Sequence, residues 1–91
     1  MPFLRTASQA MLAGALETAL QAASEACHRA PLLPAAHYLY GQVWLALARN
    51  REAERAFAQA LQLDPNWADA WINYGVARYR EGHIEDAEEM S

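Results

Sequence analysis

Apolar residues along this chain follow the spacing of amphipathic helices, and proline, glycine and asparagine separate the apolar segments. A helix is predicted to begin at Pro34, because the first turn of a helix loses no hydrogen bond to a missing N–H. The helix is predicted to break at residues 48–50, where Asn50 suits a left-handed helix end or a cap. One face of this helix carries Tyr40, Val43, Trp44 and Leu47, at positions i, i+3, i+4 and i+7.

Further helices are predicted on both sides of this one. The next helix ends at the Asp-Pro-Asn sequence of residues 64–66, because proline disfavours a helical conformation in the residue before it. Another spans 67–81 and is followed by a turn at Gly82 and a helix over 84–90. One helix precedes Pro31, and a weaker one spans 3–13. The predicted apolar faces are Ala53, Ala56, Phe57, Ala60 and Leu61; Trp71, Tyr74, Ala77 and Arg78; and Leu16, Ala19, Leu20, Ala23 and either Cys27 or Ala26.

The pattern repeats every 34 residues. A fixed period between 20 and 50 residues is typical of a stacked array, in which each unit buries its apolar face on the next. The matching positions are Ala7, Gly41 and Gly75; Gly14, Ala48 and Gly82; Ala19, Ala53 and Ala87; Ala26 and Ala60; and Pro31 and Pro65.

Small residues at these positions suit close helix packing. Packed helices lie about 8–10 Å apart, depending on the side chains at the contact. Gly41 and Gly75 lie one turn from aromatic residues and are predicted to let a partner helix approach. Ala53 and Ala60 do the same from the partner, and Phe57 fills the remaining space. A large side chain at such a crossing would overpack it, at a cost of about 1–3 kcal/mol.

Composition and charge narrow the function classes. A chain of 91 residues forms one small domain at most, and its 21 alanines favour helix. The net charge is −4, with seven arginines and no lysine, so the basic clusters that grip phosphate backbones are missing and no nucleic-acid partner is expected. Neither a secretory signal nor a membrane-spanning stretch of about 20 apolar residues is present. We expect no membrane partner and a cytoplasmic location.

Catalytic and metal-binding residues are not indicated. Cys27, the only cysteine, forms no internal disulfide and has no zinc-ligand spacing with the three histidines. The four glycines are isolated, unlike those of a phosphate-binding loop, and no nucleophile–base–acid arrangement is visible. The acidic residues within 85–89 indicate a solvated helix face rather than a metal or basic-partner site. We expect no enzyme activity, no cofactor and no metal.

The joint pattern resembles the tetratricopeptide repeat. Residues 34–67 match best, through Gly41, Trp44, Ala53, Phe57, Ala60 and Pro65. They depart from the family at His37, where tryptophan is usual, and at Ala48, where glycine is usual. Residues 68–91 depart at Arg78, where an aromatic residue is expected. The resemblance implies an all-α, right-handed solenoid of antiparallel helix pairs. Residues 1–91 would form a single domain with repeats at about 1–33, 34–67 and 68–91, the last incomplete.

The resemblance also implies a concave groove, lined by the first helix of each repeat, that holds a peptide or a helix. Several apolar residues at the implied positions lie off the predicted core stripes and are left over after the core is filled. The groove residues are Tyr38, Gln42, Leu45, Asp69, Ile72, Asn73, Val76, Tyr79 and Arg80, with Ala46 and, in the first repeat, Leu4, Ser8, Met11 and Leu12. The family's clamp for a C-terminal carboxylate uses lysine, which this chain lacks, so binding of chaperone tails is not expected.

The sequence therefore predicts a protein–protein interaction module without catalysis of its own. Two alternatives stay open. In the first, the chain forms the N-terminal repeats of a larger bacterial enzyme of glycosyltransferase or sulfotransferase type; in the second, it is a self-assembling scaffold. In the second case the incomplete last repeat would leave Trp71 and Tyr74 partly uncovered, which would favour a homo-oligomer formed through the C-terminal end.

Overall fold

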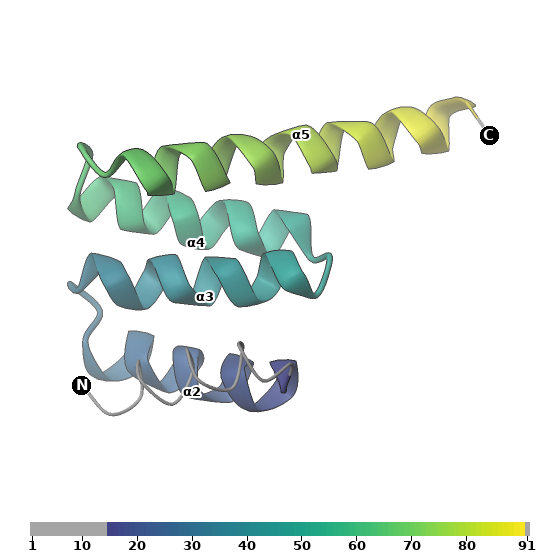
Figure 1. The fold of residues 1–91 in the computed structure, drawn as a ribbon. Helices are drawn as coiled ribbons and strands as arrows, with labels where there is room; N and C mark the ends of the chain where they lie inside the picture. Colours follow the sequence, from purple (N-terminus) through teal and green to yellow (C-terminus); the bar gives the residue numbers. More distant parts are fainter. Residues whose placement is uncertain (1–14, 91) are drawn as a thin grey trace.

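The computed structural model describes residues 15–90, with side chains through residue 82, and these residues form four helices and no strand. The helices are α2 (Leu16–Arg29), α3 (Pro34–Ala46), α4 (Asn50–Leu63) and α5 (Ala68–Met90). They lie side by side in chain order, each antiparallel to the one before it (Figure 1). The predicted all-α fold is confirmed; the weaker helix over 3–13 and the first-repeat groove positions lie outside the described residues.

Helix α3 begins and ends through identifiable local chemistry. Pro34 occupies its first turn, as predicted. At the other end, the Arg49 amide bonds to the Trp44 carbonyl at 2.9 Å and the Ala48 amide to the Leu45 carbonyl at 3.0 Å, which is the Schellman pattern. Ala48 has φ 60°, so Ala48, and not Asn50, is the left-handed residue. This corrects the prediction: Asn50 is the buried first residue of α4.

Alanine methyl groups form most of the core, so the helices pack closely. In α4 the predicted stripe is confirmed, since all five of its residues are buried. In α2, Ala19, Ala23 and Ala26 are buried, whereas Cys27 is half-buried. The largest fully buried side chains among the described residues are Phe57 and Val43. Each belongs to one of two apolar clusters, Val43 to that between α2 and α3 and Phe57 to that joining α3, α4 and α5.

Gly41 lies at a close contact between α3 and the Phe57 ring of α4. A methyl group at this position would lie 2.7 Å from Cε1 of the Phe57 ring, so a side chain here cannot be accommodated without displacing the ring. The prediction for Gly41 is therefore consistent with the structure, but the matching prediction for Gly75 is wrong. A methyl group at Gly75 would meet no atom within 4 Å, because no described helix covers that side of α5.

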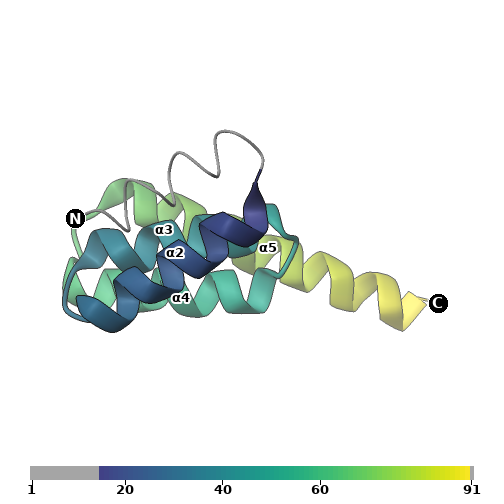
Figure 2. The ribbon, with the colours of Figure 1, turned by 90° about the horizontal axis from the view of Figure 1, so that it is seen from below.

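Helix α5 continues where a turn was predicted. It passes through Gly82 without interruption and extends beyond the ends of the other helices (Figure 2). Continuing a helix adds one backbone hydrogen bond per residue, and a single glycine costs only about 1 kcal/mol. A helix folded back over 84–90 would have only Ile84, Ala87 and Met90 as apolar side chains to offset the cost of the turn.

The predicted apolar face of α5 is also rotated from the observed one. Ala70 and Ala77 are fully buried against α4, Tyr74 is partly buried, and Trp71 and Arg78 are exposed. The period placed Trp71 in the core because a repeat array buries both sides of each helix. In this structure α5 is the last described helix of the row, so only one of its sides is covered.

The interhelix loops repeat with the same period as the sequence. The Ala30 amide bonds to the Ala26 carbonyl at 2.8 Å, and the Asp64 amide bonds to the Ala60 carbonyl at the same distance. The Leu33 amide then bonds to the Ala30 carbonyl at 3.1 Å, and the equivalent bond from Trp67 is 3.3 Å long. The 34-residue period thus describes the backbone geometry of the loops as well as side-chain positions.

Candidate interaction groove

Helices α3 and α5 contact each other directly, beside α4, and carry the predicted groove residues of the second and third repeats. A hydrogen-bond network joins three of them. The Tyr38 hydroxyl accepts a bond from Asn73 Nδ2 at 3.0 Å and one from Gln42 Nε2 at 3.2 Å. Asn73 Nδ2 also donates to the Asp69 carbonyl at 2.9 Å, which fixes the amide on its own helix. The structure therefore brings Tyr38, Gln42, Asn73 and Asp69 together.

The Tyr38 ring anchors this network to the core. It lies 4.4 Å from the Trp67 ring and 5.7 Å from the Phe57 ring, measured between centroids. Burial, reinforced by the negative charge of Asp69, raises the pKa of the Tyr38 hydroxyl, so it stays protonated. Because its oxygen already accepts two hydrogen bonds, the hydroxyl proton is the group that it can still offer.

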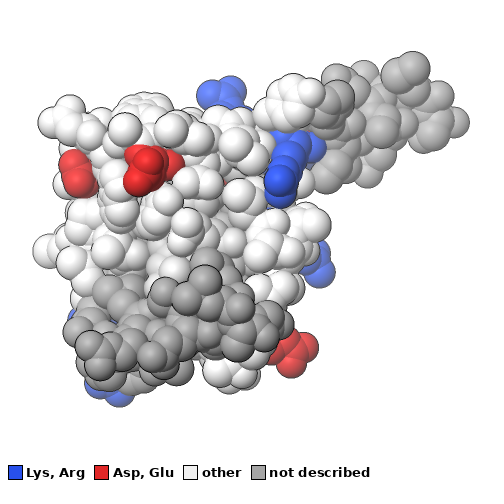
Figure 3. All heavy atoms as spheres, in the orientation of Figure 1, with Lys and Arg blue, Asp and Glu red and all other residues white. Residues whose placement is uncertain are grey.

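A hollow of about 340 Å³ adjoins the network and is lined by Gln42, Leu45, Ala46, Asn73 and Arg80. Its lining combines two amides, an aliphatic wall and one guanidinium, which suits a peptide better than a purely apolar ligand. Two other predicted residues, Ile72 and Tyr79, are exposed on α5 but do not line the hollow. Among the described residues, uncharged ones make up most of the face seen in Figure 3.

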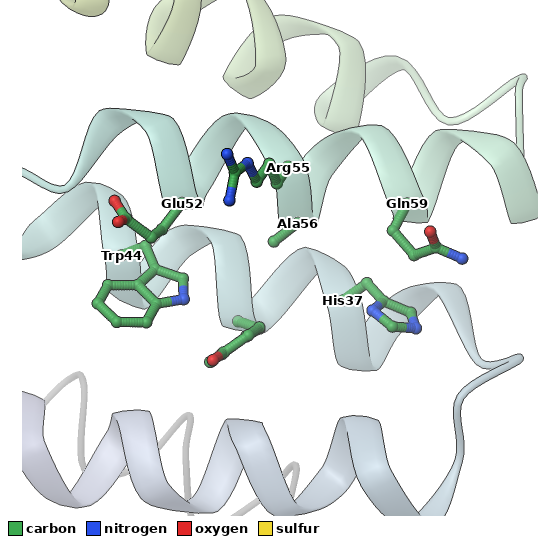
Figure 4. Close-up of a pocket in the computed structure, with 7 residues that line it drawn as sticks. His37, Trp44, Glu52, Arg55, Ala56 and Gln59 are labelled. Atoms are coloured by element: carbon green, nitrogen blue, oxygen red, sulfur yellow. The ribbon is translucent and has the colours of Figure 1, made fainter.

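A second hollow, of about 260 Å³, lies on the other side of α3. The α3 residues that line it point away from Tyr38 and Gln42, because of their spacing along the helix. The lining is His37, Tyr40 and Trp44 from α3 with Glu52, Arg55, Ala56 and Gln59 from α4 (Figure 4). Tyr40 and Trp44 meet edge to face, with centroids 5.6 Å apart. A third hollow, of about 250 Å³, lies between α4 and α5 and includes Trp71 and Tyr74.

Sequence reasoning missed a pair of equivalent hydrogen bonds. Trp71 Nε1 donates to the Pro65 carbonyl at 2.7 Å, and His37 Nε2 lies 2.8 Å from the Pro31 carbonyl. A carbonyl only accepts, so His37 donates through Nε2. His37 therefore does in one repeat what Trp71 does in the next. The signal was present in the sequence, since both pairs are six residues apart and one period from each other.

A charged cluster joins α4 to α5. Arg51 pairs with Glu81 at 3.0 Å, and Arg78 lies 3.9 Å from Glu54. The two carboxyl groups also face each other. A hydrogen bond with Glu81 raises the pKa of Glu54, and the same bond lowers the pKa of Glu81. When the two carboxyl groups share a single proton, Glu54 therefore carries it and Glu81 is ionised.

Comparison with known families gives one match. Residues 49–90 match a family model described as "Tetratricopeptide repeat". No curated protein matches the chain. Within the described part of the chain, no three His, Cys, Asp or Glu side chains are grouped so that they could hold a metal ion. None of the described helices is both long and apolar enough to cross a membrane.

Proposed function

Because residues 49–90 belong to the tetratricopeptide repeat family, whose repeats are interaction modules and typically non-catalytic, we propose that the groove between α3 and α5 binds an extended peptide or a helix of a protein partner. The observation that carries this proposal is the network of Tyr38, Gln42 and Asn73. It holds polar groups in fixed positions at the junction of the two helices. Fixed polar groups bind a ligand without the entropic cost of ordering them.

The network offers one donor and one acceptor to a ligand. The Tyr38 hydroxyl accepts twice and keeps its proton for donation to a ligand carbonyl. Both Nδ2 bonds of Asn73 are directed inward, and its Oδ1 accepts no hydrogen bond from the described residues. A peptide backbone presents a carbonyl and an N–H in alternation, which matches this donor and acceptor.

The adjacent hollow supplies contacts for ligand side chains. Leu45 and Ala46 form an apolar wall, while Arg80 can pair with an acidic side chain. We therefore expect ligands that combine apolar residues with an acidic one.

Substitution of Tyr38 tests this proposal. Peptides are first selected against the wild-type protein from a random display library, and the binding of the best synthetic peptide is then measured by isothermal titration. Tyr38→Phe keeps the ring contacts with Phe57 and Trp67 but removes the donor, so affinity should fall about 5- to 10-fold, the effect of one hydrogen bond.

Tyr40→Phe is the matched control, because Tyr40 lies on the same helix but in the hollow on its other side. It should leave the affinity unchanged. Equal affinities for wild type and Tyr38→Phe, in a protein whose circular dichroism is unaltered, would place the binding site elsewhere. The proposal would then fail even if the peptide binds.

A second candidate is self-association through the C-terminal end. Trp71 is 51% exposed and Tyr79 is 67% exposed, which is unusual for large apolar side chains and favours contact with another surface. This candidate is compatible with the first, because it uses another side of α5.

A further inference from the structure

Helix α5 has one side that no described helix covers. It packs on α4, and its opposite side faces outward at the end of the row (Figure 1). Helical spacing brings Trp71, Gly75 and Tyr79 into one line, at i, i+4 and i+8. The residues of this side, here called the end face of α5, are Ala68, Trp71, Ile72, Gly75, Arg78, Tyr79 and Gly82.

The end face is more apolar than a solvated helix surface. Trp71, Ile72 and Tyr79 are 51%, 64% and 67% exposed. Its one charged residue, Arg78, is already engaged: it pairs with Glu54 and lies over the Tyr74 ring, 5.7 Å from the centroid. Solvated faces of helices normally carry charged and polar residues, so this composition indicates a surface that binds another protein.

Trp71 is held in position although half of its surface is exposed. Its indole N–H donates to the Pro65 carbonyl at 2.7 Å, and its ring meets Tyr74 edge to face at 6.0 Å. A side chain that is already ordered loses little conformational entropy when it is covered. Tryptophan in such a position is typical of residues that dominate the energy of an interface.

The chain itself shows what covers an equivalent face. One period earlier, Gly41 on α3 is covered by α4, an antiparallel helix that places Phe57 over the glycine. Gly75 occupies the same position on α5 and has open space above it. The occupant expected there is another antiparallel helix.

We propose that the end face of α5 binds the end face of a second copy of this chain, with the two α5 helices antiparallel and a two-fold axis passing beside Gly75. This arrangement continues the antiparallel alternation of the row. It deepens the self-association named above and does not depend on peptide binding. With Gly75 at the axis, Trp71 of each copy lies level with Tyr79 of the other, and Ala68 lies level with Gly82.

The pairing is complementary in size and charge. The two aromatic pairs flank a crossing made of glycine, so the helices can approach closely where no side chain intervenes. Arg78 lies level with Ile72 of the second copy, so its aliphatic stem meets an apolar residue while its charge stays paired with Glu54. Like charges on the two end faces therefore do not oppose each other.

The size of the face sets the strength of the association. Large apolar side chains bury about 150–250 Å² each, so the three exposed ones contribute on the order of 400 Å² per copy. The resulting total of about 800 Å² is below the roughly 1,200 Å² of a stable complex. We expect a concentration-dependent dimer, with a dissociation constant on the order of 100 μM or weaker.

Sedimentation equilibrium of full-length Gly75→Glu and Gln59→Glu tests the proposal. Each adds one carboxylate at an exposed helical position, and space is open at Gly75, so both should fold. Gly75→Glu brings two like charges together at the axis and should weaken association at least tenfold, whereas Gln59→Glu, on α4, should behave as wild type. A wild type that stays monomeric up to millimolar concentration, or equal association of the two variants, would overturn the proposal.

Cross-linking then tests the symmetry. In a Cys27→Ser background, Gly75→Cys should form a disulfide-linked dimer under mild oxidation, because the axis brings this position next to itself. Gln59→Cys should not. Faster cross-linking through position 59 would show that a different surface associates. Tyr38→Phe should leave association unchanged, so failure of the dimer and failure of the groove are distinguishable.

Discussion

The same substitution, glycine to alanine, should have opposite effects at Gly41 and Gly75, which lie one repeat apart. At Gly41 the new Cβ would lie 2.7, 2.8 and 2.9 Å from Cε1, Cδ1 and Cζ of Phe57, whereas carbon atoms in favourable contact lie about 3.5–4.0 Å apart. Phe57 is fully buried, so its ring cannot move without displacing its neighbours. At Gly75 the Cβ would meet nothing within 4 Å.

The magnitudes follow from two opposing effects. Alanine is more favourable than glycine within a helix by about 1 kcal/mol, and Gly75→Ala should gain this stability in full. Overpacking a core by one methyl group costs about 1–3 kcal/mol. Gly41→Ala should therefore be destabilised by up to about 2 kcal/mol, and the two variants should differ by the whole overpacking cost.

Urea denaturation followed by circular dichroism measures both free energies of unfolding, at concentrations low enough to keep the chain monomeric. A double-mutant cycle then assigns the cause. Phe57→Leu removes part of the ring, so Gly41→Ala should cost less in that background than in wild type. The packing argument would be refuted if Gly41→Ala were as stable as Gly75→Ala, or if its cost were the same with and without Phe57.

Three further predictions concern other residues. Ala48→Gly should stabilise the protein by about 0.5–1 kcal/mol in the same assay, because Ala48 has φ 60°; Ala58→Gly, within α4, should instead destabilise by about 1 kcal/mol. Since the pKa of Glu54 is raised in the folded state, its contribution to stability is present at low pH and is lost as the pH rises through that pKa; Glu54→Gln should therefore flatten the pH dependence of the free energy of unfolding, measured by urea denaturation at several pH values. Burial raises the pKa of Cys27 to about 11, so a thiol reagent at pH 8 should react at least about 30-fold faster in denaturant than in the native protein, and equal rates would contradict its burial.

The apolar pattern predicted the buried face of α4, which packs against a described helix on each side, and failed for α5, which packs mainly on α4. For α4, periodicity identifies every buried apolar residue, because packing against α3 and α5 decides which side chains are buried; the burial of Asn50 was not predicted. For α5 the same pattern placed Trp71 in the core and a turn at Gly82. Both inferences assume a following helix. Periodicity reports which side chains could be buried, and a neighbouring helix decides whether they are.

The candidate groove was predictable as a set of positions but not as a network. Helical spacing and the family resemblance place Tyr38 and Asn73 on the same side of neighbouring helices, and the binding role of this side remains a prediction. The sequence could not show that the Tyr38 hydroxyl accepts bonds from both Asn73 and Gln42, since the distances depend on how α3 and α5 are set by the Phe57 ring between them.

Residue identity at a repeat position also proves less informative than the bond that the residue makes. His37 departs from the family pattern and Trp71 agrees with it, yet each donates a ring N–H to the carbonyl of a proline six residues earlier. The repeat requires at this position a planar side chain whose N–H can reach that carbonyl. The carbonyl needs such a donor because it lies in a turn and has no helical partner. The turn at Pro31 therefore makes the same kind of ring N–H bond as the turn at Pro65, although residues 34–67 match the repeat pattern best.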